Sequence, residues 1–259
     1  MKIGFIVNED KDKNFKYTKN LIKFCTEKNT IPLILKNFQN LINTEKVIFL
    51  NEDDLFNQSD FIVILGGDGT ILRWAKKIVK YNKNILGINM GNLGYLTDVE
   101  KHEGFLAIEK VLNKEYDVEK RMMLGVHIND KEYISLNEVN INNGNVSRMV
   151  KIGIDINNRF VDAFSADGLI ISTPTGSTAY NLSAGGPILK PDTELIAITY
   201  VCPHALFSRP YVISANDEIK AYITNKESIA YLSLDGQESI PINYGDSVYI
   251  KKSSFYTNI

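Results

Sequence analysis

Cysteine is scarce in this sequence, and long apolar runs and an excess of charge of either sign are absent. The two cysteines, Cys25 and Cys202, are too few for a disulfide framework and indicate a reduced, cytoplasmic protein. No stretch approaches the ~20 apolar residues of a membrane span, and the apolar residues 3–7 are too short for the core of a signal peptide. Basic and acidic residues number 29 and 31, so no overall positive field recruits nucleic acid or a membrane surface.

Histidine is also sparse, and this bears on metal binding. His102, His127 and His204 are far apart in the sequence, and Cys202 beside His204 has no partner at metal-ligand spacing. We therefore expect no dedicated metal cage and interpret these residues as structural.

The first hundred residues alternate between two hydrophobic periods. Apolar, β-branched runs at 3–7, 31–35, 61–65 and 85–88 predict strands, and the segments 15–24 and 74–79 have helical spacing. This βαβα order predicts a parallel sheet covered by helices, with ligands at the carboxyl ends of its strands. Pro32 weakens the second strand and suggests an edge position.

The pattern changes near Glu100. After a short helix at 105–112, many short alternating segments separated by polar turns predict an antiparallel sandwich. The predicted strands are 124–128, 133–135, 139–141, 150–156, 160–164, 169–171, 195–201, 219–223, 231–234 and 248–250. The length of 259 residues suits two modest domains, which we assign to residues 1–99 and 100–259.

The predicted strand at 61–65 ends abruptly in Gly66-Gly67-Asp68-Gly69-Thr70. Glycine lets the backbone turn sharply and lets an anion approach it closely, and Thr70 is a plausible N-cap of a following helix. Strand, glycine turn and helix N-terminus together predict a phosphate site built from backbone. No Lys-Ser or Lys-Thr follows the glycines and a third fingerprint glycine is missing, so neither familiar phosphate loop is present.

Asp68 is the unusual member of this turn. A carboxylate repels a bound phosphate unless a cation or a reacting proton lies between them, so Asp68 suggests proton transfer. The alternative is that Asp68 caps the turn or the helix, and spacing alone does not decide between the two. A second glycine-rich exit at residues 87–95 follows the next strand, and the two exits side by side predict a crevice.

The other unusual stretch lies in the second half. After the strand at 169–171 come a dozen small, hydroxylic and glycine residues up to Pro187, and Asp167 precedes that strand. Such a segment donates hydrogen bonds and lets a flat ligand lie close to the backbone, and Asp167 has an acceptor for ribose hydroxyls or an amide. The alternative is a polar loop without function; framing by an apolar strand and by Tyr180 and Leu182 argues against a flexible linker.

These motifs, in this order and at these spacings, resemble the bacterial NAD kinases over essentially the whole chain. The first motif also occurs in lipid kinases, whereas the long second one is specific. The matching segments are Gly66-Gly67-Asp68-Gly69-Thr70, Gly91-Asn92-Leu93-Gly94-Tyr95, Asn137-Glu138, Asp167-Gly168, Thr175-Gly176-Ser177-Thr178-Ala179-Tyr180, Gly185-Gly186-Pro187 and Asp235-Gly236-Gln237.

The resemblance implies a fold and a reaction. The fold is an α/β N-terminal domain, phosphofructokinase-like or Rossmann-like, joined to a β-sandwich, with the site between them; the last segment of the chain is expected to pack back on the first domain. The reaction is transfer of the γ-phosphoryl of a nucleoside triphosphate to the 2′-hydroxyl of the adenosine ribose of NAD, giving NADP. A divalent cation, Mg²⁺ carried with ATP, is the expected cofactor. Such enzymes are usually homodimers or tetramers in which a neighbouring subunit completes the NAD site.

The resemblance also implies roles for individual residues. Asp68 acts on the 2′-hydroxyl, and Gly69 lies against the dinucleotide. Asn137 and Glu138 contact the adenine and ribose side, while Asp167 and residues 178–183 line the nicotinamide and its ribose. The implied substrate-binding residues are Gly66, Gly67, Gly69, Arg73, Tyr95, Asn137, Glu138, Arg148, Asp167, Thr178, Ala179, Tyr180, Asn181, Leu182, Ser183 and Gln237.

Two other functions compete with this one. A lipid kinase would need an apolar groove or a membrane-facing surface in place of the polar loop, and a non-catalytic dinucleotide sensor would dispense with Asp68. The sequence leaves open whether polyphosphate replaces ATP, whether NADH is accepted, whether NADPH inhibits and how many subunits assemble. Many members of the family continue into a C-terminal helix after the last strand, whereas this sequence ends at Ile259.

Overall fold

The chain divides into two units in the computed structural model, which describes residues 1–42, 44, 46–91, 94–143, 149–205 and 208–259. The first unit comprises Met1–Lys120 and Thr257–Ile259, and the second Arg121–Tyr256. The division therefore lies at Lys120, later than the boundary that the sequence suggests near Glu100. Strand β6 (Val99–Glu100) pairs with the sheet of the first unit, and helix α4 (Gly104–Asn113) packs on it, which explains the difference.

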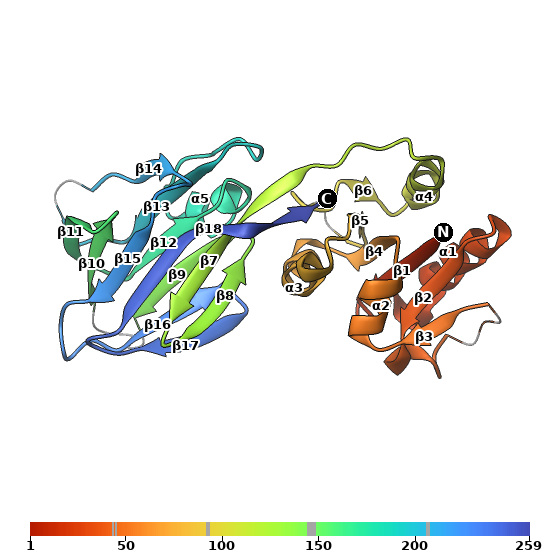
Figure 1. Ribbon diagram of the computed structural model, residues 1–259, viewed down its shortest axis with the longest axis horizontal. Coiled ribbons are helices and arrows are strands. Elements are labelled where there is room, and N and C mark those ends of the chain that lie inside the picture. Colours follow the sequence, from red (N-terminus) through yellow and green to blue (C-terminus); the bar gives the residue numbers. More distant parts are fainter. Residues whose placement is uncertain (43, 45, 92–93, 144–148, 206–207) are drawn as a thin grey trace. The chain divides into compact units, whose positions relative to one another are not determined.

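A parallel six-stranded sheet forms the centre of the first unit (Figure 1). Its strand order is β3-β2-β1-β4-β5-β6. β1 and β4 are buried almost throughout, as the continuous apolar runs predict for central strands covered on both faces. The remaining bounds are β1 Lys2–Val7, β2 Ile31–Leu35, β3 Ile48–Leu50, β4 Phe61–Gly66 and β5 Ile85–Asn89.

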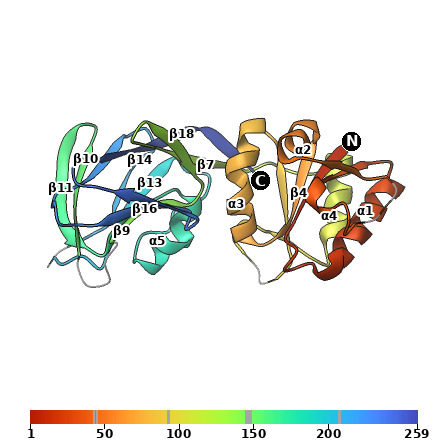
Figure 2. The same cartoon turned by 90° about the horizontal axis from the view of Figure 1, so that it is seen from below.

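Helices cover both faces of this sheet (Figure 2). On one face α1 (Lys16–Glu27) packs against α4, where Phe105 makes edge contacts with Tyr17 and Phe24. On the other face α2 (Glu52–Gln58) meets α3 (Asp68–Ile78) through Phe56 and Trp74. Short 3₁₀ helices are η1 Lys13–Phe15, η2 Lys36–Phe38 and η3 Val79–Tyr81. The layered α/β domain predicted from the sequence is confirmed.

The prediction of an edge position for β2 is wrong, because the short strand β3 lies outside it. β3 begins opposite Leu33, so the pairing leaves Pro32 facing no residue of β3. The missing N–H of Pro32 therefore costs no hydrogen bond on that side. Three residues are too few to show a period, which is why the sequence does not reveal β3.

Two six-stranded antiparallel sheets form the second unit, with orders β11-β10-β15-β18-β7-β8 and β14-β13-β12-β9-β16-β17. Apolar side chains from both sheets, such as Ile152 and Ile171, form one buried core between them, so the predicted sandwich is confirmed. The bounds are β7 Lys120–Ile128, β8 Lys131–Ser135, β9 Glu138–Asn143, β10 Val150–Ile156, β11 Arg159–Ala166, β12 Gly168–Ser172, η4 Thr175–Thr178, α5 Tyr180–Ser183, β13 Leu195–Val201, β14 Tyr211–Ser214, β15 Ile219–Ile223, β16 Ala230–Leu234, β17 Glu238–Ile242 and β18 Ser247–Asn258.

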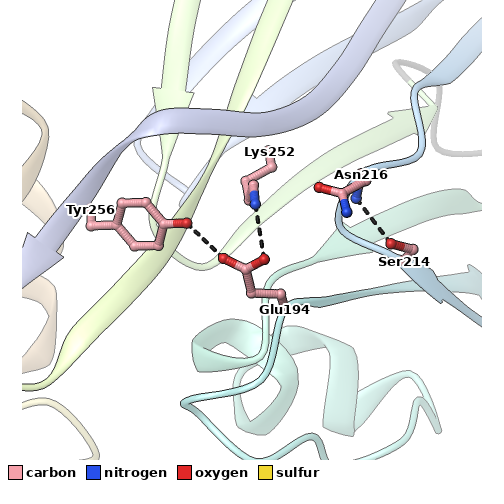
Figure 3. A network of polar contacts seen from close by, with 5 residues as sticks. All are labelled: Glu194, Ser214, Asn216, Lys252 and Tyr256. Carbon is pink, nitrogen blue, oxygen red and sulfur yellow. Dashed lines mark hydrogen bonds and ion pairs between the residues drawn. The ribbon is translucent and has the colours of Figure 1, made fainter.

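A carboxylate links the last strand to the opposite sheet of the sandwich (Figure 3). Lys252 and Tyr256, both on β18, donate to Glu194 just before β13 at 2.9 and 2.7 Å. These two hydrogen bonds lower the pKa of the Glu194 carboxyl. Beyond Tyr256 the chain re-enters the first unit, where Ile259 and Glu119 exchange backbone hydrogen bonds of 2.8 and 2.9 Å.

None of the helices in the described ranges combines the length and apolarity that a membrane crossing requires.

Candidate active site

The glycine turn after β4 leads directly into α3. The helix begins at Asp68 with Gly67 as its N-cap, three residues earlier than an N-cap at Thr70 implies, so that expectation is wrong. Thr70 instead occupies the third helical position, where its hydroxyl accepts from Asn8 Nδ2 at 3.2 Å and from the Gly67 N–H at 3.5 Å. A Cβ on Gly66 would lie 2.4 Å from Thr70 Oγ1, so only glycine fits this close approach.

The Asp68 carboxylate is held by the segment that follows β5. Its Oδ2 accepts from the Tyr95 N–H at 2.7 Å, and its Oδ1 accepts from the Leu96 N–H at 3.1 Å and the Thr97 hydroxyl at 3.2 Å. A Cβ on Gly94 would lie 2.0 Å from Oδ1, so this contact requires glycine there. In the part of the chain that the structure describes, the hydrogen bonds to the Asp68 carboxylate all come from residues 95–97 and none from its own helix. Asp68 therefore joins the exits of the adjacent strands β4 and β5.

A polar cavity of about 940 Å³ opens at the carboxyl ends of the strands of the first unit. The residues that line it include Gly67, Asp68 and Gly69 of the glycine turn and Arg73, which follows on α3. The strands β1, β2 and β3 contribute their exits as well: Asn8, Glu9, Asp10, Lys11, Leu35, Lys36, Asn37, Phe38, Leu50, Asn51 and Glu52. This is the edge at which a parallel sheet of this kind binds ligands.

Lys11 is a site residue that the sequence analysis misses. Its ammonium group lies over the glycine turns: a Cβ on Gly67 would be 2.8 Å from Nζ, and a Cβ on Gly91 3.2 Å from it. The described residues offer this Nζ no carboxylate within ion-pair distance. A free cation at this place suits an anionic ligand. No sequence signal marks Lys11, because it belongs to a solvent-exposed, lysine-rich segment.

In the second unit, Asn137 and Glu138 lie at the start of β9. Both side chains are buried, with exposed fractions of 8% and 7%. Within the described residues, Asn137 Oδ1 and Glu138 Oε2 have no hydrogen-bond partner. Burial, and next the negative charge of Asp235, raise the pKa of Glu138 to about 7. Two oriented, unpaired acceptors form a receptor for N–H or O–H groups.

The polar loop after β12 is ordered by its own side chains. Asn181 is fully buried, its amide N–H groups bond to the carbonyls of Ser177 and Pro187, and its Oδ1 accepts from Thr199 at 2.7 Å. The Asn181 side chain is thus used inside the loop. Tyr180, Leu182 and Ser183 are exposed, and Thr178 and Ala179 are half-buried.

Asp167 is not brought together with the Asn137–Glu138 pair within one chain. Glu138 pairs with Ser172 at one end of the β9–β12 ladder, whereas Asp167 accepts from Asn143 at the other end. Five residues of strand separate the two ends by about 16 Å. Asp167, which the resemblance assigns with residues 178–183 to the nicotinamide side, therefore lies at the end of the ladder opposite to Glu138.

The remaining predicted residues are more peripheral. The Tyr95 side chain is 67% exposed, and its backbone N–H is the part that contacts Asp68. Gln237 is exposed in the turn after β16. Arg148 lies outside the described residues. No trio of metal-ligating side chains occurs among the residues that the structure describes, and Cys25 and Cys202 are both free.

Comparison with known proteins supports one family. The model of the ATP-NAD kinase N-terminal domain matches residues 3–116, and that of the C-terminal domain matches residues 136–259. The chain is 42% identical to an NAD kinase of Thermoanaerobacter sp. (strain X514), covering 100% of this chain and 93% of that protein. It is 37% identical to an NAD kinase of Clostridium beijerinckii, covering 97% and 87%.

Solved structures agree with the sequence matches. A yeast NADH kinase complexed with NADH superposes with a TM-score of 0.87 at 25% identity, covering 100% of this chain and 83% of that chain. An NAD kinase from Archaeoglobus fulgidus in complex with ATP superposes with a TM-score of 0.80 at 26% identity, covering 100% and 93%. Matches along both halves decide against a lipid kinase that shares only the glycine-aspartate turn. The chain belongs to the ATP-NAD kinase family.

Proposed function

We propose that this protein transfers the γ-phosphoryl group of ATP to the 2′-hydroxyl of the adenosine ribose of NAD and so makes NADP. The observation that carries this proposal is the Asp68 carboxylate, held by three donors in the lining of the crevice beside the glycine turn. Membership of the family and the ATP and NADH complexes of its structural relatives support the two substrates.

Asp68 is the proposed proton acceptor. A carboxylate has about four acceptor positions, and the three donors from residues 95–97 leave one of them open, on Oδ2. A ribose hydroxyl bonded there gives its proton to Asp68 as its oxygen attacks the γ-phosphorus; the bond from that phosphorus to the β,γ-bridging oxygen breaks, and ADP leaves. Phosphoryl transfer depends mainly on alignment and charge neutralisation, and the fixed carboxylate supplies alignment without a covalent intermediate.

The triphosphate is proposed to bind in the crevice. The glycine turn lets the phosphates approach the backbone at the start of α3, and the ammonium group of Lys11 neutralises part of their charge. Arg73, which also lines the crevice, adds a second cation. The crevice is polar, as a nucleotide site requires.

The residues of the crevice fit a magnesium ion carried by the triphosphate. Mg²⁺ usually binds through one or two carboxylates and substrate phosphates, and the carboxylates of Glu9 and Asp10 line this cavity together with Asp68 as the proposed proton acceptor. The ion would neutralise negative charge on the phosphates. EDTA is expected to abolish turnover, and excess Mg²⁺ to restore it, while NAD affinity stays unchanged.

The dinucleotide is proposed to bind the second unit. Asn137 and Glu138 offer their unpaired oxygens to the adenine and ribose side, and the exposed face of residues 178–183 contacts the rest of NAD. Tyr95, Gln237 and Arg148 remain further proposed contacts. The position of Asp167 at the far end of β12 supports a homo-oligomer in which this carboxylate serves the NAD of a neighbouring copy. The free cysteines favour a reducing cytoplasm.

One assay tests the function. Protein, NAD, ATP and Mg²⁺ are mixed, and NADP is detected with an NADP-specific dehydrogenase. We expect continuous NADP formation that depends on all four components. Binding of NAD by calorimetry without any NADP formation would overturn the proposal in favour of a dinucleotide sensor.

A further inference from the structure

The turn that presents Asn137 and Glu138 is organised by a single carboxylate from another strand connection. Asp235 Oδ1 accepts from the N–H groups of Asn137 at 2.7 Å and Glu138 at 3.3 Å, and Oδ2 accepts from that of Leu136 at 3.1 Å. The hydroxyl of Ser135 donates to the same carboxylate. In return, the Asp235 N–H donates to the Glu138 carbonyl at 3.1 Å. Three successive amides thus form a nest around one buried anion.

Asp235 holds this position because of the hairpin in which it lies. Asp235 and Gly236 both have positive φ, 52° and 64°, and the Gln237 N–H closes the turn on the Leu234 carbonyl at 3.0 Å. The connection between β16 and β17 is three residues long, 235–237, and it begins with an Asp-Gly pair at positive φ, the pair that tight hairpin turns favour. The aspartate is 6% exposed, far more buried than a turn residue needs to be. Turn formation alone does not account for its contacts 97 to 100 residues away in the sequence.

The organised turn leaves two buried oxygens without partners. Asn137 Oδ1 and Glu138 Oε2 have no donor among the described residues, although the backbone of the same two residues is fully engaged with Asp235 and Thr173. Leaving buried acceptors unpaired costs free energy, so a structure that fixes them in this state is prepared for a ligand.

We propose that Asp235 is the positioning residue of the dinucleotide site: by binding the amides of residues 136–138 it fixes Asn137 and Glu138 so that their free oxygens receive N–H and O–H donors of NAD. This inference rests on the proposed function. In this proposal Asp235 acts through its neighbours and not on the ligand; the family resemblance includes the segment Asp235-Gly236-Gln237 but assigns Asp235 no role.

The charge of Asp235 also acts on Glu138. Asp235 is the charged group that raises the Glu138 pKa after burial, to about 7. The neighbouring elements contribute the hydroxyls of Ser135, Ser172 and Thr173 and, from β16, the apolar Leu234, none of which titrates in this range. The ionised form of Glu138 is the better acceptor, so kcat/KM for NAD should fall as the pH drops below about 7.

Asp235→Asn is the decisive variant, because asparagine keeps the positive φ of the turn but replaces one acceptor oxygen with a donor. We expect KM for NAD and the calorimetric Kd to rise about 10-fold or more, whereas kcat and KM for ATP change less than about 3-fold. Removing the negative charge should also lower the pH below which kcat/KM for NAD falls, the acid limb of the pH profile, by on the order of one unit. Glu138→Gln should abolish that limb.

Asp130→Asn is the matched control. Asp130 also lies in a hairpin turn at positive φ, as the second residue of the two-residue connection Asn129-Asp130 with φ of 48° and 59°, and it lies outside the proposed site. Its KM, kcat and pH profile should stay within about twofold of wild type. A loss of kcat at unchanged KM in Asp235→Asn, or an unshifted acid limb, would overturn the inference.

Two further results separate the possible failures. If wild type binds NAD but makes no NADP, the proposed function fails. The NAD affinities of Asp235→Asn and of its control Asp130→Asn still decide the role of Asp235. If Asp235→Asn shows no cooperative thermal transition, Ser135→Ala takes its place, since it removes one donor and leaves the three amides. It should raise KM for NAD about 3-fold at constant kcat; no change in KM refutes the role of Asp235.

Discussion

The Tyr95 N–H donates a hydrogen bond of 2.7 Å to the Asp68 carboxylate, which ties the exit of β5 to the exit of β4. The same carboxylate that we assign to chemistry therefore also orders the segment that follows the neighbouring strand. Structural and catalytic roles coincide in one side chain. Variants must be chosen so that the two roles can be measured separately.

Asp68→Asn is expected to lower kcat by at least ~10² while NAD binding is largely retained. The amide oxygen can still accept from the residue 95–97 segment, but asparagine cannot take up the proton of the 2′-hydroxyl. Steady-state kinetics with the coupled assay and calorimetric NAD titration give the two quantities. If the variant keeps more than about a tenth of wild-type turnover, Asp68 is not the proton acceptor.

Two glycines of the site should respond differently to alanine. At Gly94 a Cβ would lie 2.0 Å from Asp68 Oδ1, so Gly94→Ala should lower both the melting temperature and, by about 10-fold or more, kcat.

At Gly69 a Cβ meets nothing within 4 Å, so Gly69→Ala should fold with unchanged or slightly higher stability. It should nevertheless lose kcat/KM, because the proposed dinucleotide lies against this residue. Full activity of Gly69→Ala would remove Gly69 from the site.

Lys11→Met is expected to raise KM for ATP by about 10-fold and to leave KM for NAD unchanged, because the lost charge faces the proposed phosphates. Lys13→Met is the control: Lys13 is exposed and does not line the cavity. Initial rates with varied ATP at saturating NAD measure the effect. A change of less than about twofold for Lys11→Met would place the triphosphate elsewhere.

Glu138→Gln should stabilise the protein at about pH 8. In the folded state the pKa is raised to about 7 from 4.5, so the folded protein holds this proton more tightly than the unfolded chain. The free energy of unfolding of the wild type therefore falls by about 3 kcal/mol as the pH rises from about 4.5 to 7, and it stays constant above that pH. The substitution removes this loss, and below about pH 4.5 the difference between the two proteins should disappear.

Urea denaturation at several pH values measures this difference, with the exposed Glu132→Gln as the control substitution. If the difference in free energy of unfolding between Glu138→Gln and wild type does not grow with pH, the buried carboxyl ionises without a cost to stability.

The layered fold and the glycine turn could be predicted from local sequence, because apolar periodicity and glycine placement are local properties. The predictions were wrong where contacts between segments far apart in the sequence determine the position of a strand or the start of a helix. The edge position of Pro32 depended on β3, whose three residues carry no period. The start of α3 at Asp68 was set by the backbone of Gly67, whereas the hydroxyl of Thr70 bonds to Asn8 from a different strand exit.

Residues that act across long sequence distances were the hardest to predict. The sequence around Asp235 predicts a hairpin turn, whereas the donors to its carboxylate at residues 135–138 lie about a hundred residues earlier. Lys11 reads as one of several solvated lysines, and its position over Gly67 exists only once the exits of β1 and β4 are adjacent. Asp167 matches its motif, but no pattern indicates that it lies at the opposite end of the ladder from Glu138.

The paired hydrogen bonds between Glu119 and Ile259 make the sandwich an insertion within the α/β unit. A ribosome must therefore translate all of Arg121–Tyr256 before the three residues that complete the first unit emerge. Deleting only Thr257–Ile259 should consequently destabilise the unit that carries Asp68, although the deleted residues are far from Asp68 in the sequence.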